Sequence, residues 1–276
     1  MSRLDFSFDD RVVRHYDALR GHPPDVAHTI GEALVGSCAS HAPAPSSLRL
    51  LELGVGTGRI ALPVAAAGAE VIGIDLSADM LGTLSKQLHE APANIQLIRG
   101  DITALPFRAN TFDGAMVTHV LHLVADWPAV LQRLAEVVKP EGLLLLGRDW
   151  VDPASMAGQI RNAFRQAVMR QGFKTAAPAG GPALHQALLA VGAQAIRVGP
   201  EELVAAEWRA EISPAQVLEG IRSRDDAESW VLPDEVLEPV CQELEAMVNT
   251  HWPDSKTPQE ILRRFVVSVY QTAAAA

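Results

Sequence analysis

The chain of 276 residues has only two cysteines, and its basic residues are outnumbered by acidic ones. Cys38 and Cys241 lie far apart and form no CxxC pair, which excludes a disulfide framework and a structural zinc site of the usual ligand spacing. The 23 Lys and Arg against 33 Asp and Glu give a formal net charge of -10. No cluster of Lys and Arg occurs, so we expect no nucleic-acid partner.

Long hydrophobic runs are also absent. No window of about 18 apolar residues occurs, so no membrane span is expected. The first residues, MSRLDFSFDD, lack the apolar stretch of a signal peptide. We therefore expect a cytoplasmic protein, and the few cysteines fit a reducing compartment. With 48% hydrophobic and 20% charged residues, the composition is that of an ordinary globular protein with a sizeable core.

The first half of the chain alternates short apolar runs with amphipathic segments. Strands are predicted over 48–53, 70–74, 95–98, 111–117 and 143–146. Helices are predicted over 10–20, 23–38, 60–67, 77–89 and 127–138. This alternation is typical of βαβ units, and hence of a parallel sheet covered by helices on both faces.

The second half is less regular. Helices are predicted over 154–171, 183–191, 214–222 and 233–249, and strands over 193–198, 203–208 and 264–270.

The most informative motif, LELGVGTGR (51–59), lies between the first predicted strand and a helix. Glycines there let the chain turn sharply and let a ligand approach the main chain, although a glycine-rich turn without a ligand is the simpler alternative. Asp75 ends the second predicted strand, where a carboxylate can accept both hydroxyls of a ribose. The GxGxxG loop of nicotinamide enzymes needs a third small residue for close helix packing, but Arg59 stands there. The GxGxG loop suits a ligand without pyrophosphate, and a NAD-dependent oxidoreductase is kept as an alternative.

Five segments together carry a family resemblance: LELGVGTG (51–58), VIGIDLSADML (71–81), RGDITALPF (99–107), FDGAMVTHVLHLVADW (112–127) and LAEVVKPEGLLLLG (134–147). In these segments the chain resembles the class I S-adenosylmethionine-dependent methyltransferases, especially the branch of the ubiquinone/menaquinone-biosynthesis methyltransferases. The resemblance covers roughly residues 48–147 and implies S-adenosylmethionine as cofactor and S-adenosylhomocysteine as product. The last motif usually reads KPGG in this family, and we interpret Glu141 as a variation in a surface turn.

The resemblance also implies which residues hold the methionine part of the cofactor. Glu52 would hold it together with the loop backbone, namely Gly54, Gly56, Thr57 and Gly58. Thr118 would lie beside the same end of the cofactor. In related enzymes an N-terminal tyrosine and a basic residue cover the cofactor, and Tyr16 and Arg20 match them loosely.

The adenosine part has its own implied contacts. Asp75 would accept hydrogen bonds from the ribose hydroxyls, and Asp101 would accept one from the adenine amino group. The residues implied around the adenine are Leu76, Met80, Gly100, Asp101 and Ile102.

Methyl transfer from a sulfonium is a direct displacement, so the enzyme mainly aligns the reacting atoms. A base is needed only if the acceptor must lose a proton. His119 and His122 follow the fourth predicted strand, and the ordinary pKa of histidine suits a general base, so both are candidate catalytic residues. Packing of the two histidines is the alternative. Their HxxH spacing could suggest a metal pair, but no third ligand is placed to complete it, and no metal is expected.

The acceptor is approached by exclusion. The Asn/Asp-Pro-Pro-aromatic motif of methyltransferases acting on nucleobase amino groups does not follow the fourth predicted strand, where Thr118-His119-Val120-Leu121 stands. The magnesium-binding carboxylates of catechol-type enzymes are not evident either. A small-molecule acceptor is therefore expected. Trp230 and Trp252 could line an apolar pocket for it or belong to the insert's own core.

The expected fold is α/β, a Rossmann-like seven-stranded mostly parallel sheet with its last strand antiparallel and helices on both faces. We expect an N-terminal helical lid (1–40), a methyltransferase core (41–208 and 261–276) and a helical insert that forms a substrate lid (209–260). The protein is expected to be a monomer or homodimer. A non-catalytic S-adenosylmethionine-binding protein is the alternative from another functional class.

Overall fold

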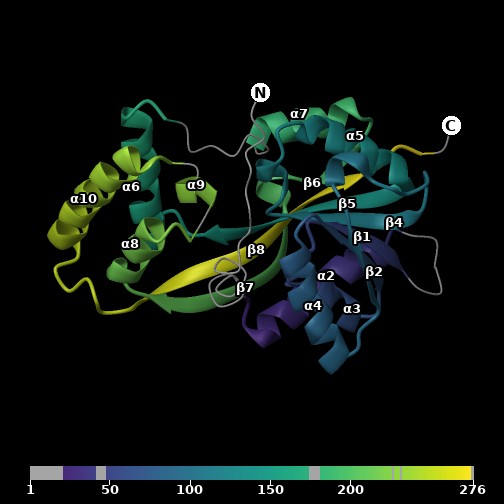
Figure 1. Ribbon diagram of the computed structural model, residues 1–276, viewed down its shortest axis with the longest axis horizontal. Helices are drawn as coiled ribbons and strands as arrows, with labels where there is room; N and C mark the ends of the chain where they lie inside the picture. Colours follow the sequence, from purple (N-terminus) through teal and green to yellow (C-terminus); the bar gives the residue numbers. More distant parts are fainter. Residues whose placement is uncertain (1–20, 42–47, 174–180, 226, 231, 275–276) are drawn as a thin grey trace. The chain divides into compact units, whose positions relative to one another are not determined.

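The computed structural model describes residues 21–41, 48–173, 181–225, 227–230 and 232–274 (Figure 1). The predicted helix over 10–20, and with it Tyr16 and Arg20, lies outside the described residues. The chain divides into two compact units. The core unit consists of Met1–Arg148, Pro178–Ala206 and Phe265–Ala276, and the second unit of Asp149–Ala177 and Glu207–Arg264.

The predicted mostly parallel sheet is confirmed. Its strands are β1 (Arg49–Leu53), β2 (Glu70–Asp75), β3 (Ile95–Arg99), β4 (Phe112–Thr118), β5 (Val138–Val151), β6 (Gln194–Arg197), β7 (Leu203–Ile212) and β8 (Gln259–Gln271). They follow the order β3-β2-β1-β4-β5-β8-β6, with β7 also paired to β8. The strands β1 to β5 pair in parallel, whereas β6 and β8 are antiparallel.

The sheet has eight strands, one more than the predicted seven. All eight segments predicted as strands occur, and the additional member of the sheet is β7, from the predicted segment 203–208. It pairs with β8, whose 13 residues pair with β6 only over Val269–Gln271.

The helices of the core unit cover both faces of the sheet. They are α2 (Pro24–Ala39), α3 (Ala61–Ala66), α4 (Ala78–Glu90), α5 (Trp127–Val137) and α7 (Gly181–Ala190). Figure 1 shows α2, α3 and α4 on one side of the sheet and α5 and α7 on the other. Side-chain caps fix two of the starts, because Ser77 accepts the N–H of Met80 and Asp126 that of Ala129. The doubly wound arrangement leaves the carboxyl ends of the strands open to a ligand.

The described part of the predicted N-terminal lid belongs to the core unit. Helix α2 packs on α3 so closely that a Cβ on Gly31 would lie 2.3 Å from the carbonyl oxygen of Pro63.

The second unit is a cluster of helices with its own apolar core. It contains α6 (Met156–Arg170), α8 (Pro214–Arg222), α9 (Ala227–Trp230) and α10 (Asp234–His251). The sequence prediction assigned residues 149–177 to the methyltransferase core, but α6 buries Ile160 and Phe164 in the same core as Leu244 of α10. Trp252 packs, half-buried, against this core, as the second of its two sequence interpretations expected.

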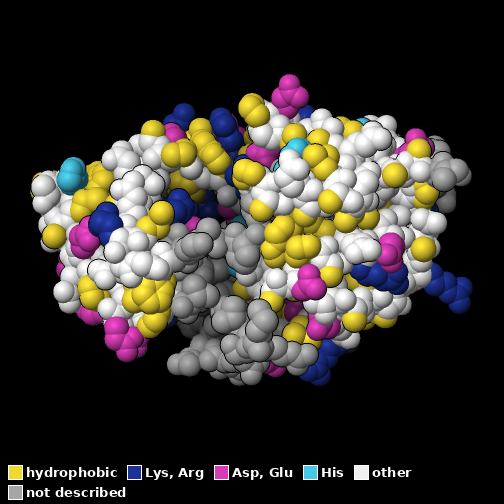
Figure 2. Space-filling view, turned by 90° about the horizontal axis from the view of Figure 1, so that it is seen from above, with side chains coloured by type: hydrophobic (Ala, Val, Ile, Leu, Met, Phe, Trp, Pro, Cys, Tyr) yellow, Lys and Arg dark blue, Asp and Glu magenta, His cyan; other side chains and the backbone are white. Residues whose placement is uncertain are grey.

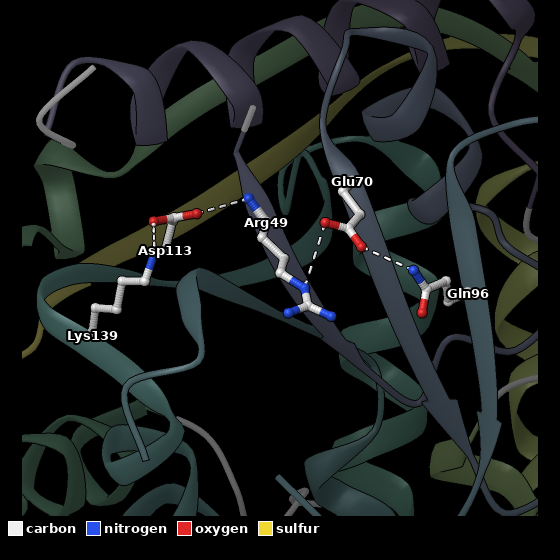
Figure 3. Close-up of polar contacts among 5 residues, drawn as sticks. All are labelled: Arg49, Glu70, Gln96, Asp113 and Lys139. Carbon is white, nitrogen blue, oxygen red and sulfur yellow. Dashed lines mark hydrogen bonds and ion pairs between the residues drawn. The ribbon is translucent and has the colours of Figure 1, made fainter. Parts of the chain in front are cut away.

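A chain of polar contacts joins the starting ends of five adjacent strands (Figure 3). The Gln96 amide donates to Glu70 at 2.9 Å, and Glu70 pairs with the Arg49 guanidinium at 3.5 Å. The Arg49 backbone N–H donates to Asp113 at 2.8 Å, and Asp113 pairs with Lys139 at 2.6 Å. These contacts fix the order of β3, β2, β1, β4 and β5 at the end of the sheet opposite to the glycine loop.

Glu141 adopts a left-handed backbone conformation, which the sequence did not predict. It lies in an irregular stretch of β5, where Phe112 pairs with Val138 but Gly114 already pairs with Leu143. Its φ of 60° is in the left-handed region, where glycine is favoured, and its side chain is exposed. The glycine usual at this position in the family thus has a backbone reason.

We predict that Glu141→Gly stabilises the protein. Left-handed backbone costs a non-glycine residue about 1–2 kcal/mol, and the added chain entropy of unfolded glycine cancels roughly half of this gain. The expected net increase in the free energy of unfolding is about 0.5–1 kcal/mol, measured by urea denaturation. Glu141→Ala keeps the strained backbone and should give no increase. A lower stability of Glu141→Gly than of wild type would contradict this account.

Candidate functional site

The glycine loop leaves the end of β1 as a tight left-handed turn. Gly54, Gly56 and Gly58 have φ values of 67°, 54° and 89°. The backbone N–H groups of Gly54 and Val55 both donate to the carbonyl oxygen of Ile74, at 2.9 and 3.2 Å. The loop is thereby attached to the end of β2.

The three glycines serve different purposes. A Cβ on Gly54 would lie 2.6 Å from Val120, and one on Gly58 would lie 2.5 Å from Leu84. Both positions therefore need glycine for packing within the protein. A Cβ on Gly56 would meet no described atom closer than the Gly54 carbonyl oxygen, at 4.0 Å. Among the described residues, nothing covers the main chain at Gly56, and this is where a ligand can approach the loop.

Asp75 connects this open position to the end of β2. Its Oδ2 accepts the N–H of Gly56 at 2.8 Å, and its Oδ1 accepts the N–H of Ser77 at 2.8 Å. Burial raises the pKa of Asp75, and the two N–H bonds oppose this rise. Each carboxylate oxygen can accept a second hydrogen bond, so the ribose contact expected from the sequence is compatible with this geometry. The structure adds a second role, because Asp75 also holds the glycine loop in shape.

Glu52 is the most deeply buried carboxyl of the site, with 3% of its surface exposed. It accepts a hydrogen bond from the N–H of Ala61, but its Oε2 has no partner among the described residues. The pKa of Glu52 is raised to about 8: burial is the largest cause, while Arg59 lowers it, Asp75 raises it and the Ala61 N–H lowers it. The Glu52 side chain therefore lies beside the glycine loop, as expected from the sequence. Few hydrogen bonds replace the water that this carboxyl group loses on burial.

Arg59 and His22 are parts of this site that the sequence prediction missed. The Arg59 guanidinium acts electrostatically on Glu52 and lies 3.3 Å from Nε2 of His22. His22 in turn packs edge-on against Phe265 of β8, in the core unit. Arg59 was read only as the residue that breaks the GxGxxG pattern, and nothing local in the sequence signals that His22 would face it.

The segment after β4 lies against the glycine loop, because Val120 packs directly on Gly54. His119 adopts a φ of 52°, a left-handed conformation that costs a non-glycine residue about 1–2 kcal/mol. His122 lies in the short helix η2 (Leu121–Leu123), and both histidines are half-buried. Thr118, at the end of β4, lies beside Gly147 of β5. The loop contacts of Val120 bring the predicted catalytic stretch and the predicted cofactor loop together.

The residues expected around the adenine follow β2 and β3. Leu76 is 67% exposed although it is a large apolar residue, whereas Met80 and Ile102 are buried. Gly100 donates its N–H to the Asp75 carbonyl oxygen at 2.9 Å. Asp101 caps the short helix η1 (Ile102–Ala104), since its Oδ1 accepts from the N–H and the hydroxyl of Thr103.

The part of the chain that the structure describes contains neither a metal-ligand cluster nor a membrane-spanning helix. No group of three or more His, Cys, Asp or Glu side chains is arranged to hold a metal ion there. No described helix combines the length and the apolar character needed to cross a membrane.

Comparisons with known proteins identify the family. A family model described as "Methyltransferase domain" matches residues 51–146. The demethylmenaquinone methyltransferase of Renibacterium salmoninarum is 30% identical over 169 residues, which are 61% of this chain and 67% of that protein. The chain belongs to the class I S-adenosylmethionine-dependent methyltransferases. The resemblance seen in the sequence motifs is thereby confirmed.

Other known proteins are similar to part of the sequence or to the fold. The ubiquinone/menaquinone biosynthesis C-methyltransferase UbiE of Syntrophotalea carbinolica is 38% identical over 100 residues, or 36% of this chain, and the chain spans 42% of its length. Phosphoethanolamine N-methyltransferase 2 of Haemonchus contortus, solved with S-adenosyl-L-methionine, shares the fold with a TM-score of 0.53 at 15% identity. That match covers 98% of this chain and 59% of the other.

The buried Glu52 predicts a pH dependence of stability. Its pKa is about 8 in the folded protein against an ordinary 4.5, so between these values the folded state keeps a proton that the unfolded state loses. This contribution to stability is complete below pH 4.5 and is lost as the pH rises toward 8. Up to about 1.4 kcal/mol per pH unit is expected in this window. Urea denaturation from pH 5.5 to 7.5 should show a smaller decline for Glu52→Gln than for wild type, and parallel declines would contradict the assignment.

Proposed function

We propose that the protein transfers the methyl group of S-adenosylmethionine to a small-molecule acceptor. One observation carries the proposal: the uncovered main chain at Gly56 is bonded to Asp75 and lies beside the buried carboxyl of Glu52. These groups lie at the carboxyl ends of β1 and β2, where an open α/β sheet binds its ligand. The family membership supports the same activity.

The chain's own residues would bind and orient the two reactants. Glu52 and the loop at Gly56 hold the methionine end, Asp75 binds the ribose, and exposed Leu76 packs against the adenine, in keeping with its apolar surface. Tyr16 and Arg20 belong to the proposed cofactor cover. When bound, S-adenosylmethionine supplies a methyl group that is already activated by the sulfonium, so the proposal includes no metal ion. What the protein adds is alignment at short range.

The proposal also covers the acceptor, the cellular location, the oligomeric state and the partners. The acceptor is a small molecule, and the segments 1–40 and 209–260 are each proposed as a lid. The proposed location is the cytoplasm, the proposed state a monomer or homodimer, and no nucleic acid takes part. On the face seen in Figure 2, Lys and Arg form several small separate groups with Asp and Glu among them, which supports the last point.

Two other functions are alternatives to this proposal. A NAD-dependent oxidoreductase would need a small residue where Arg59 stands. A non-catalytic protein that binds S-adenosylmethionine would share every contact described above. Titration with NAD separates the first from our proposal. An acceptor screen that detects release of S-adenosylhomocysteine separates the second.

Binding of S-adenosylhomocysteine tests the proposed site through Gly56. A methyl group at Gly56 would stand over the open main chain, so Gly56→Ala should weaken binding at least about tenfold in calorimetry, equivalent to 1.4 kcal/mol. Gly199→Ala is the matched control, because Gly199 has a φ of 60° and open space around its Cα but lies elsewhere in the core unit. Both variants should lose about 1–2 kcal/mol of stability from backbone strain. Equal affinity in the two variants would refute the site.

The two histidines after β4 are proposed as catalytic, one of them as a general base. With an acceptor in hand, loss of the base should lower the single-turnover rate by about 10²–10⁴-fold and remove its rise with pH. His119→Asn is the suitable change at φ 52°, because Asn tolerates left-handed backbone, and His122→Gln is its counterpart. Affinity for S-adenosylhomocysteine should stay the same in both. Full rates in both variants would leave alignment alone as the mechanism.

A further inference from the structure

We infer that Glu52 is protonated in the ligand-free protein and releases its proton when the cationic amino group of the S-adenosyl ligand binds. This inference rests on the proposed function. It adds that binding of the methyl donor, and release of its product, are linked to pH through one buried carboxyl. The proton leaves the carboxyl group for solvent, and no other bond changes.

The geometry gives Glu52 little that could stabilise a negative charge. It lies at the end of β1 between Gly73 of β2 and Met116 of β4, neither of which carries a charge. Among the described residues, the N–H of Ala61 donates a hydrogen bond to it, and Oε2 has no partner. A carboxylate taken out of water needs several such bonds or a close cation, so the neutral acid is favoured here.

The charged neighbours come from the surrounding elements and act in opposite directions. Arg59, from the loop before α3, attracts a charge on Glu52, while Asp75, at the end of β2, repels it. The Arg59 guanidinium is shared with His22, which precedes α2. Burial exceeds these effects, and it raises the pKa of Glu52 to about 8.

An ammonium group bound beside Glu52 reverses this balance. It adds a second cation beside Glu52 to that of Arg59, so the carboxylate becomes the favoured form and a proton is lost on binding. Below the pKa of the free protein, each unit of pH then changes the affinity up to tenfold, because deprotonation becomes part of the binding reaction. At neutral pH, about one proton should be released per ligand bound.

The experiment is calorimetric titration of the full chain with S-adenosylhomocysteine at pH 7 in buffers of different ionisation enthalpy. The dependence of the binding enthalpy on the buffer gives the number of protons released, expected to be close to one. The control ligand is 5′-methylthioadenosine, which lacks the amino acid end and should release none. Glu52→Gln should abolish the release, whereas Glu70→Gln, at the opposite end of the strands beside Arg49 and Gln96, should retain it.

The outcomes separate this inference from the proposed function. If S-adenosylhomocysteine does not bind, the proposed function fails. If it binds without proton release, or if 5′-methylthioadenosine releases the same proton, the function stands and the role of Glu52 is overturned. The comparison of the two ligands on wild type decides the matter even if Glu52→Gln does not fold.

Discussion

The hydrogen bond from the Gly56 N–H to the Asp75 carboxylate links the two strand ends on which the site depends. It closes the left-handed turn after β1 onto the end of β2, and it aims the loop toward the open side of the sheet. The packing of Val120 on Gly54 and of Leu84 on Gly58 holds the rest of the loop from behind. Of these three glycines, only Gly56 has open space for an added Cβ among the described residues, and this is where we propose that a ligand approaches.

The same arrangement places two carboxyl groups where water is largely excluded. The loss of hydration of Asp75 is offset by hydrogen bonds from the backbone N–H groups of Gly56 and Ser77, which stabilise a carboxylate. Glu52 receives one such bond and leaves an oxygen without a partner among the described residues. Asp75 is therefore better satisfied by hydrogen bonds than Glu52, and under our proposal Glu52 is the carboxyl that a cationic ligand would stabilise most.

The sequence predicted the parts of the structure that depend on local pattern. The strands β1 to β4, the helix α4 and the glycine loop were found because apolar periodicity and turn chemistry act over a few residues. The close approach of Val120 to Gly54 and the contact between Arg59 and His22 join distant segments, and no local signal marks them. The packing of helix α6 on α10 also joins distant segments, since the pattern of α6 shows an apolar face but not its partner. Glu141 was read as a neutral variation because a sequence does not show φ.

A structure of the protein with S-adenosylhomocysteine is the most direct measurement of the central claim. The account predicts that the ribose hydroxyls bond to Asp75, that the main chain at Gly56 contacts the ligand and that the amino group lies beside Glu52. It also predicts that the sulfur points toward the segment after β4. A ligand bound away from Gly56, or a ribose that leaves Asp75 without a contact, would contradict it.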